Sequence, residues 1–136
     1  MNLFSIETGN FKLDGGAMFG VVPKALWEKT NPADDKNRID MSARCLLIED
    51  GKKLILVDAG LGDKQSEKFF SHYSRWGDRT LVDSLKAEGF SPDDITDVFF
   101  THLHFDHCGG ATKREGDKKA IFGNCAGNTK IPKRYN

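Results

Sequence analysis

The sequence predicts one mixed domain of class α/β (α+β), in which helices flank a β-sheet. Its length of 136 residues suits a single hydrophobic core. Hydrophobic residues make up 38% of the chain and charged residues 29%, and these fractions exclude a disordered protein. Strand-like segments come first, helical segments follow, and another strand-like segment comes after them, so the order of elements is mixed.

Two strands are expected near the N-terminus, over residues 2–7 and 11–19. Gly15 and Gly16 interrupt the second strand, which suggests a β-bulge or a close approach of the backbone at that point. Residues 23–29 are then expected to form one helical turn.

A β-hairpin is the clearest local prediction. Two apolar runs within residues 44–58 flank the dipeptide Asp50-Gly51. This dipeptide tolerates the positive φ angles that a tight hairpin turn requires. The segment therefore predicts two antiparallel strands joined at Asp50-Gly51.

Two helices are expected after the hairpin. Asp63 would cap the first, which ends near Tyr73. The second would end at Gly89, and it carries an apolar stripe of Leu81, Val82 and Leu85. A short capped turn over residues 91–94 leads into residues 95–101, which are expected to form a buried strand.

The segment after this strand concentrates side chains that bind metals. Residues 101–110 hold three of the chain's four histidines and one aspartate within six positions, namely His102, His104, Asp106 and His107. Residues two apart share a face in an extended chain, so His102 and His104 should point to the same side. Leu103 and Phe105 should then point to the core.

Asp106 and His107 are neighbours and cannot both continue this alternation, so the chain must turn there. Gly109 and Gly110 supply backbone freedom for the turn. Two pairs of ligands can then face one pocket. Neutral imidazoles and a carboxylate suit zinc or a similar divalent ion, and two adjacent pairs suit two ions that share a bridging hydroxide. The motif therefore predicts metal-assisted hydrolysis.

A polar loop is the alternative interpretation, in which the histidines cap a strand end or cover the core. A single histidine is more often of this kind. The clustering favours a metal site for the motif. His72, in contrast, stands alone among aromatic residues and is interpreted as a histidine of the surface or core edge.

These residues resemble the metallo-β-lactamase superfamily, whose signature His-x-His-x-Asp-His follows a buried strand. Asp58, which follows an apolar strand and precedes Ala59-Gly60, is similar to the family's aspartate that supports the metal site from behind the ligands. An ordinary turn aspartate is the alternative interpretation of Asp58. Residues 16–24, 37–39 and 45–48 are similar to the lactonase-like and organophosphate-hydrolase-like branch.

The resemblance implies half of an αββα sandwich over residues 1–118, with one or two ions of zinc, or of another divalent metal, in a cleft. His102 and His104 would bind the first ion, and Asp106 and His107 the second. A hydroxide that bridges the ions would attack a lactone, an ester or a related small molecule. Asp106 would also be catalytic, because it could orient this nucleophile or move a proton.

The family pattern continues with further ligands that this sequence lacks. No histidine follows His107. We therefore expect an N-terminal half of the domain, a divergent basic tail over residues 119–136 that is truncated or frame-shifted, and little activity from the chain alone. The alternative is a noncatalytic module that binds metal, or that forms a homo-oligomer through exposed sheet edges.

Charge and cysteine content bear on partners and location. Lys and Arg balance Asp and Glu at 20 each, but residues 112–136 hold seven basic and two acidic side chains. A nuclease-like contact with nucleic acid is a third interpretation, disfavoured because only Phe122 and Tyr135 could stack on bases. Three cysteines without CxxC spacing suit a reducing compartment, so the cytoplasm is expected. No apolar run is long enough to predict a membrane span.

Overall fold

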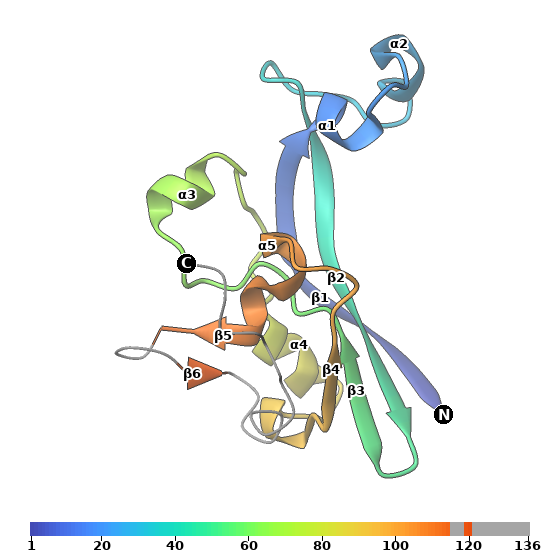
Figure 1. Ribbon diagram of the computed structural model, residues 1–136, viewed down its shortest axis with the longest axis vertical. Helices are drawn as coiled ribbons and strands as arrows, with labels where there is room; N and C mark the ends of the chain where they lie inside the picture. The colour runs from blue at the N-terminus through green and yellow to red at the C-terminus, as the bar shows by residue number, and fades with distance from the viewer. Residues whose placement is uncertain (115–118, 121–136) are drawn as a thin grey trace.

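The computed structural model describes residues 1–114 and 119–120 and confirms the predicted fold class (Figure 1). Four strands form a mixed sheet in the order β1-β2-β3-β4, with bounds Asn2–Asp14, Arg38–Asp50, Lys53–Val57 and Asp97–Phe99. β1 and β2 pair antiparallel, as do β2 and β3, whereas β3 and β4 run parallel. The carboxyl ends of β3 and β4 therefore lie at the same edge of the sheet.

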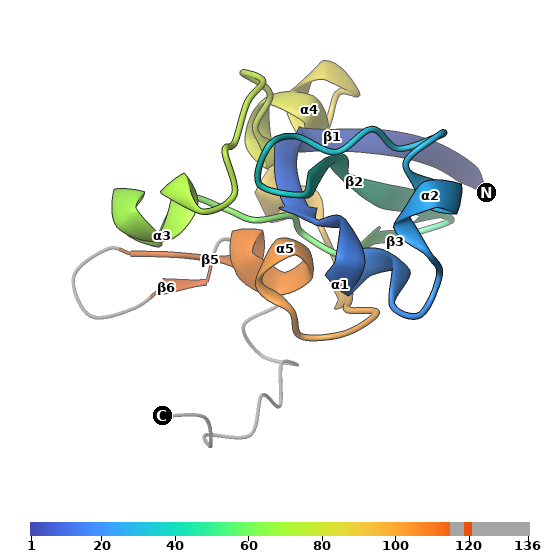
Figure 2. The same cartoon turned by 90° about the horizontal axis from the view of Figure 1, so that it is seen from above.

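Short helices and 3-10 turns connect these strands. The α-helices are α1 (Gly15–Phe19), α2 (Lys24–Trp27), α3 (Glu67–Ser71), α4 (Leu81–Ala87) and α5 (Phe105–Cys108). The 3-10 turns are η1 (Pro92–Asp94) and η2 (Gly109–Ala111), and a separate strand pair consists of β5 (Thr112–Lys113) and β6 (Lys119–Ala120). Figure 2 shows α4 on one side of the molecule, with α5, β5 and β6 on the other.

The predicted hairpin is confirmed as β2 and β3. Asp50 pairs with Lys53, so Gly51 and Lys52 form a two-residue turn. Gly51 has a φ of 60°, a conformation that glycine adopts without steric cost. The turn residue that the sequence singled out is thus the one whose backbone requires it.

The prediction of two N-terminal strands, the second reaching Phe19, is wrong in part. Residues 2–14 form a single strand with a register shift inside it. The strand ends where the Asp14 carboxylate accepts a hydrogen bond from the Ala17 N–H at 2.8 Å and so caps α1. The helical turn predicted within residues 23–29 is confirmed as α2.

The helix predicted from Asp63 to Tyr73 is shorter than expected and has another cap. The Ser66 hydroxyl accepts a hydrogen bond from the Phe69 N–H at 3.2 Å, so α3 begins after Ser66 and ends at Ser71. Asp63 instead lies in the loop that follows β3.

The second predicted helix is confirmed as α4. Leu81 and Leu85 are buried, but Val82 is 45% exposed. Gly89 follows the helix with a φ of 86°, as predicted for a residue that ends it. α4 covers one face of the sheet and completes the main core cluster of Ile6, Cys45, Leu47, Leu54, Leu56, Ala59, Leu81, Leu85 and Ile95.

The capped turn predicted over residues 91–94 is confirmed as η1, where Asp94 accepts a hydrogen bond from the Ser91 N–H at 2.7 Å. The buried strand predicted after it is only partly correct. β4 is short, and the Phe99 side chain is 60% exposed. β4 pairs with β3 alone among the described strands, and the sheet face opposite α4 leaves Phe99 uncovered.

A smaller core cluster lies toward the other end of β1. It consists of Phe11, Ala43, Leu61 and Phe70, with Phe69, Tyr73 and Phe105 packed against it. Since Phe105 is the first residue of α5, this cluster anchors the helix that carries part of the motif.

The described residues contain no helix with the length and apolarity that a bilayer crossing needs. The predicted boundary between the domain and a tail at residue 119 stays a prediction, since residues 115–118 and 121–136 lie outside the described residues.

Candidate metal centre

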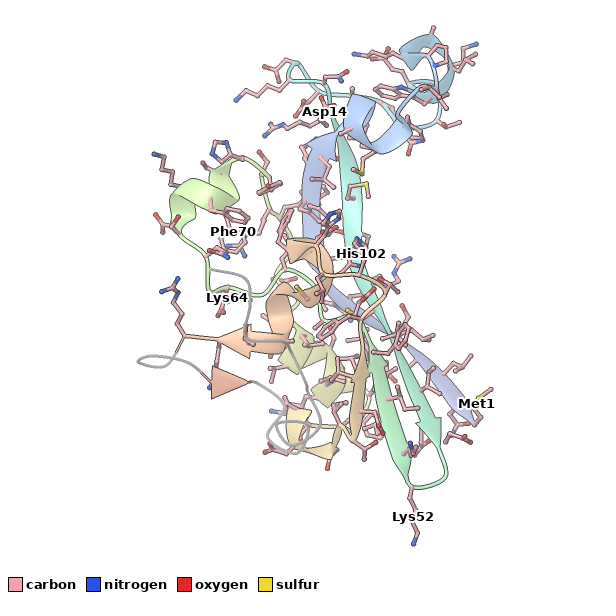
Figure 3. The ribbon with its side chains drawn as sticks, in the orientation of Figure 1. Met1, Asp14, Lys52, Lys64, Phe70 and His102 are labelled. Atoms are coloured by element: carbon pink, nitrogen blue, oxygen red, sulfur yellow. The ribbon has the colours of Figure 1, made fainter. Side chains whose placement is uncertain are left out.

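The histidine motif follows β4, bends at Thr101, continues without helix or strand through His104, and then enters α5 (Figure 3). The His104 carbonyl accepts hydrogen bonds from the N–H groups of His107 and Cys108, both at 3.0 Å. This helical turn is the change of direction predicted at Asp106 and His107. The expected burial of Leu103 is wrong, because its side chain is 67% exposed.

The first predicted ligand pair lies on the segment between β4 and α5. His102 Nε2 and His104 Nδ1 lie 3.1 Å apart, and both side chains are exposed. Two nitrogens bound to one tetrahedral zinc at about 2.0–2.1 Å would lie about 3.3 Å apart. The spacing of this pair therefore fits a shared ion.

The second pair, Asp106 and His107, lies on α5 and is less exposed than the first pair. Asp106 Oδ2 lies 3.4 Å from His107 Nε2, again the spacing of two ligands on one ion. The rings of His102 and His107 have centroids 3.9 Å apart, so the two pairs are adjacent. No three His, Cys, Asp or Glu side chains in the described ranges form a group that could hold one metal. The donors therefore fall into two pairs, and their role as metal ligands stays a prediction.

Asp58 lies directly behind the second pair. Because β3 and β4 are parallel neighbours, Asp58 at the end of β3 meets the start of the motif, and its N–H donates to the Phe99 carbonyl at 2.8 Å. Its Oδ2 lies 2.8 Å from His107 Nδ1. A carboxylate can only accept, so Nδ1 donates in this contact, and Nε2 is the nitrogen left on the Asp106 side to bind an ion.

Hydrogen bonds control the charge of Asp58. Burial alone would raise the pKa of its carboxyl, but hydrogen bonds from His107 and from the N–H and hydroxyl of Thr101 hold that pKa below its ordinary value. Asp58 thus stays ionised. The role of Asp58 as an aspartate that supports a metal site stays a prediction.

Thr101 is a candidate site residue that the sequence did not predict. Its hydroxyl donates to Asp58 Oδ2 at 2.8 Å and lies 3.1 Å from His102 Nδ1. Since the hydroxyl proton goes to Asp58, its oxygen accepts from His102 Nδ1–H, which leaves the His102 Nε2 lone pair facing His104. The only available signal was the position of Thr101 at the end of a strand parallel to the one that ends at Asp58.

The two glycines after the motif act differently from the prediction. Gly109 has a φ of −58°, which any residue can adopt, so backbone freedom is not the reason for glycine there. A Cβ atom at Gly109 would collide with the Leu61 carbonyl, and one at Gly110 with the Ala59 carbonyl. Glycine is needed because the loop after β3 packs directly on this backbone.

Comparison with known proteins places this chain among relatives. The family model for the metallo-beta-lactamase superfamily matches residues 39–113. An N-acyl homoserine lactonase from Bacillus cereus is 31% identical over 84 residues, which are 54% of this chain and 34% of that protein.

Two solved structures share the fold over 90% of this chain. A probable metal-dependent hydrolase from Staphylococcus aureus has a TM-score of 0.83 and 39% identity, with 44% of its chain covered. The dizinc quorum-quenching lactonase AidC, in complex with a product, has a TM-score of 0.63 and 31% identity, with 39% of its chain covered.

The chain therefore spans between about a third and somewhat under half of the length of these lactonase-like and hydrolase relatives. The matched family region includes Asp58, Thr101 and the whole histidine motif. With more than half of its residues inside that region, this chain belongs to the metallo-β-lactamase superfamily.

Proposed function

We propose that this chain contributes part of the dinuclear zinc centre of a hydrolase that opens lactones or cleaves related esters. The observation that carries the proposal is the pairing of donors at ion-sharing distances, 3.1 Å for His102 and His104 and 3.4 Å for Asp106 and His107. The substrate class is supported by relatives that include N-acyl homoserine lactonases.

Each motif residue has a separate role in this proposal. His102 and His104 would hold the first ion, and Asp106 and His107 the second. Bound zinc would lower the pKa of water and polarise the carbonyl oxygen of the substrate. Asp106 Oδ2 is the oxygen placed beside His107, and Oδ1 would orient the attacking water and accept its proton.

The donor count limits what the chain can do alone. A catalytic zinc usually has three protein ligands, whereas each described pair supplies two. We therefore propose that the isolated chain binds zinc weakly and turns over little substrate. Further ligands would come from protein outside these residues. A noncatalytic metal-binding module is the second candidate, and the same two-donor pairs support it.

Zinc titration by calorimetry, combined with a hydrolysis assay on N-hexanoyl homoserine lactone, tests this proposal. We expect zinc binding that is lost in a His102→Ala, Asp106→Ala double variant and kept in His72→Ala, which removes an exposed histidine outside the motif. Absence of zinc binding, or equal binding by the double variant, would contradict the metal site. Ordinary turnover by the monomeric chain would contradict its incompleteness.

A further inference from the structure

We infer that Lys64 is a positioning residue for the Asp106–His107 half of the site. Its Nζ donates to the Gly109 carbonyl at 2.6 Å, immediately after α5. Lys64 belongs to the loop after β3, outside the histidine motif, and its side chain is partly buried. The inference rests on the proposed metal function, in that the turn held by Lys64 carries the second ligand pair.

Four contacts connect the loop over residues 58–64 to residues 107–110, at the end of the motif and directly after it. Two are backbone hydrogen bonds, from the Ala59 N–H to the His107 carbonyl at 2.7 Å and from the Gly110 N–H to the Gly60 carbonyl at 2.8 Å. The other two use side chains, since Asp58 binds the His107 ring and Lys64 binds Gly109. Each of these contacts fixes a residue between 107 and 110.

The first ligand pair is held by other contacts. His102 is fixed through the Thr101 hydroxyl, and the described partner of the His104 ring is His102 itself. Lys64 contacts neither of these histidines in the described structure. Its removal should therefore affect the two halves of the site unequally.

A lysine suits this position for a physical reason. The ammonium makes a charge-assisted hydrogen bond, which is stronger than the neutral backbone bonds beside it. Burial lowers the pKa of the Lys64 ammonium, because a charged group has been drawn out of water to reach the carbonyl. Methionine would fill similar space and donate nothing, so Gly109 would lose its partner and α5 could shift.

The test compares Lys64→Met with Lys64→Arg and with Lys52→Met, which changes an exposed lysine at the hairpin tip, far from Lys64 (Figure 3). Zinc is titrated while NMR follows the ring nitrogens of His107 separately from those of His102 and His104. We expect Lys64→Met to weaken binding at His107 several-fold, which is less than the about 10- to 100-fold cost of removing a direct partner of a ligand, because Lys64 acts through Gly109. Binding at His102 and His104 should change far less, and Lys64→Arg should retain most of the affinity at His107.

Hydrogen exchange in the metal-free chain provides a second measurement. The amides of Ala59 and Gly110 form the two backbone contacts of the loop, so their exchange should accelerate in Lys64→Met and not in Lys52→Met. Unchanged exchange, or equal weakening of both ligand pairs, would overturn the role of Lys64. If the wild-type chain binds no zinc, the proposed function fails, and the exchange result still decides whether Lys64 positions the turn.

Discussion

In the proposed metal site, Asp58 and Thr101 would determine which nitrogens of two histidines bind an ion. Asp58 accepts from His107 Nδ1 at 2.8 Å, and the Thr101 hydroxyl joins Asp58 to His102 Nδ1 at distances of 2.8 and 3.1 Å. Both rings therefore present Nε2. One carboxylate and one hydroxyl thus orient a donor in each of the two ligand pairs.

Replacing Asp58 by asparagine should weaken zinc binding by about 10- to 100-fold. The amide lacks the negative charge, and its NH₂ group facing His107 would favour the wrong tautomer. Calorimetric titration of zinc measures the change. Asp50→Asn in the hairpin is the matched control, and equal affinity of the two variants would contradict the role given to Asp58.

Thr101→Val should disturb His102 more than His107. Valine keeps the shape of threonine but provides no oxygen for His102 Nδ1–H, whereas His107 keeps its bond to Asp58. Nitrogen-15 shifts of the His102 ring should show a mixture of tautomers in this variant and a single one in Thr101→Ser. A single His102 tautomer in both variants would mean that the hydroxyl does not fix the ring.

The sequence predicted the four motif residues and Asp58 as site residues because His and Asp at these spacings have few other uses, and the structure places their side chains next to one another. It did not identify Thr101, since a threonine at a strand end is common and its role depends on the neighbouring parallel strand. The burial of Leu103 was predicted wrongly for a related reason. Alternation predicts that a side chain faces away from the histidines, but not that anything covers that side.

Among the secondary-structure elements, α3 has a capping residue at its N-terminus and packs its aromatic side chains in the second core cluster. Ser66 caps this helix, and Phe69 and Phe70 on it pack in the cluster that anchors Phe105 of α5. The hairpin was predictable because two residues set its turn. The start of α3 was not, since Asp63 and Ser66 are both good caps and the fold of the preceding loop decides between them.

Ser66→Ala should lower the free energy of unfolding by about 0.5–2 kcal/mol, because the Phe69 N–H loses its side-chain partner. Asp63→Ala removes the cap that the sequence predicted but that the structure does not use, so it should change stability much less. Urea unfolding of both variants measures the difference. A larger loss in Asp63→Ala would contradict this assignment of the cap.

The loop before β2 carries a pH-dependent contribution to stability. Hydrogen bonds to Asp34, chiefly from the Arg38 backbone N–H and also from its guanidinium, outweigh desolvation and lower the pKa of this carboxyl to about 2. The folded pKa lies below the ordinary value of 3.8, so the contribution is fully present above pH 3.8 and is lost as the pH falls through about 2.

Asp34→Asn should therefore destabilise the protein at neutral pH and flatten its loss of stability between about pH 4 and pH 2. Urea unfolding at several pH values within this range measures the slope. Asp35→Asn, which changes the neighbouring residue, is the control. An acid slope in Asp34→Asn as steep as that of the wild type would contradict the assignment.

At the scale of the whole molecule, the described residues cover the sheet on one face and leave the other face open. α4 covers the face that contains Leu47 and Leu56. The opposite face carries a row in which Leu46 pairs with Val57 and Val57 with Phe99. Leu46 is 39% exposed and Phe99 60%, so much of this apolar row faces solvent. The sequence predicted the strands but could not show the open face, because apolar runs look the same whether or not something covers them.

We expect this open face to make the isolated chain self-associate, since contiguous exposed apolar surface favours contact between copies. Phe99→Lys should weaken the association by at least about tenfold, because it removes the largest side chain of the row and adds a charge that would have to leave water. Sedimentation over a range of concentrations measures the effect. Val82→Lys is the matched control, because Val82 is an exposed apolar residue on α4, on the other side of the sheet. A wild-type chain that stays monomeric at high concentration, or an equal effect of both substitutions, would show that this face is not where copies meet.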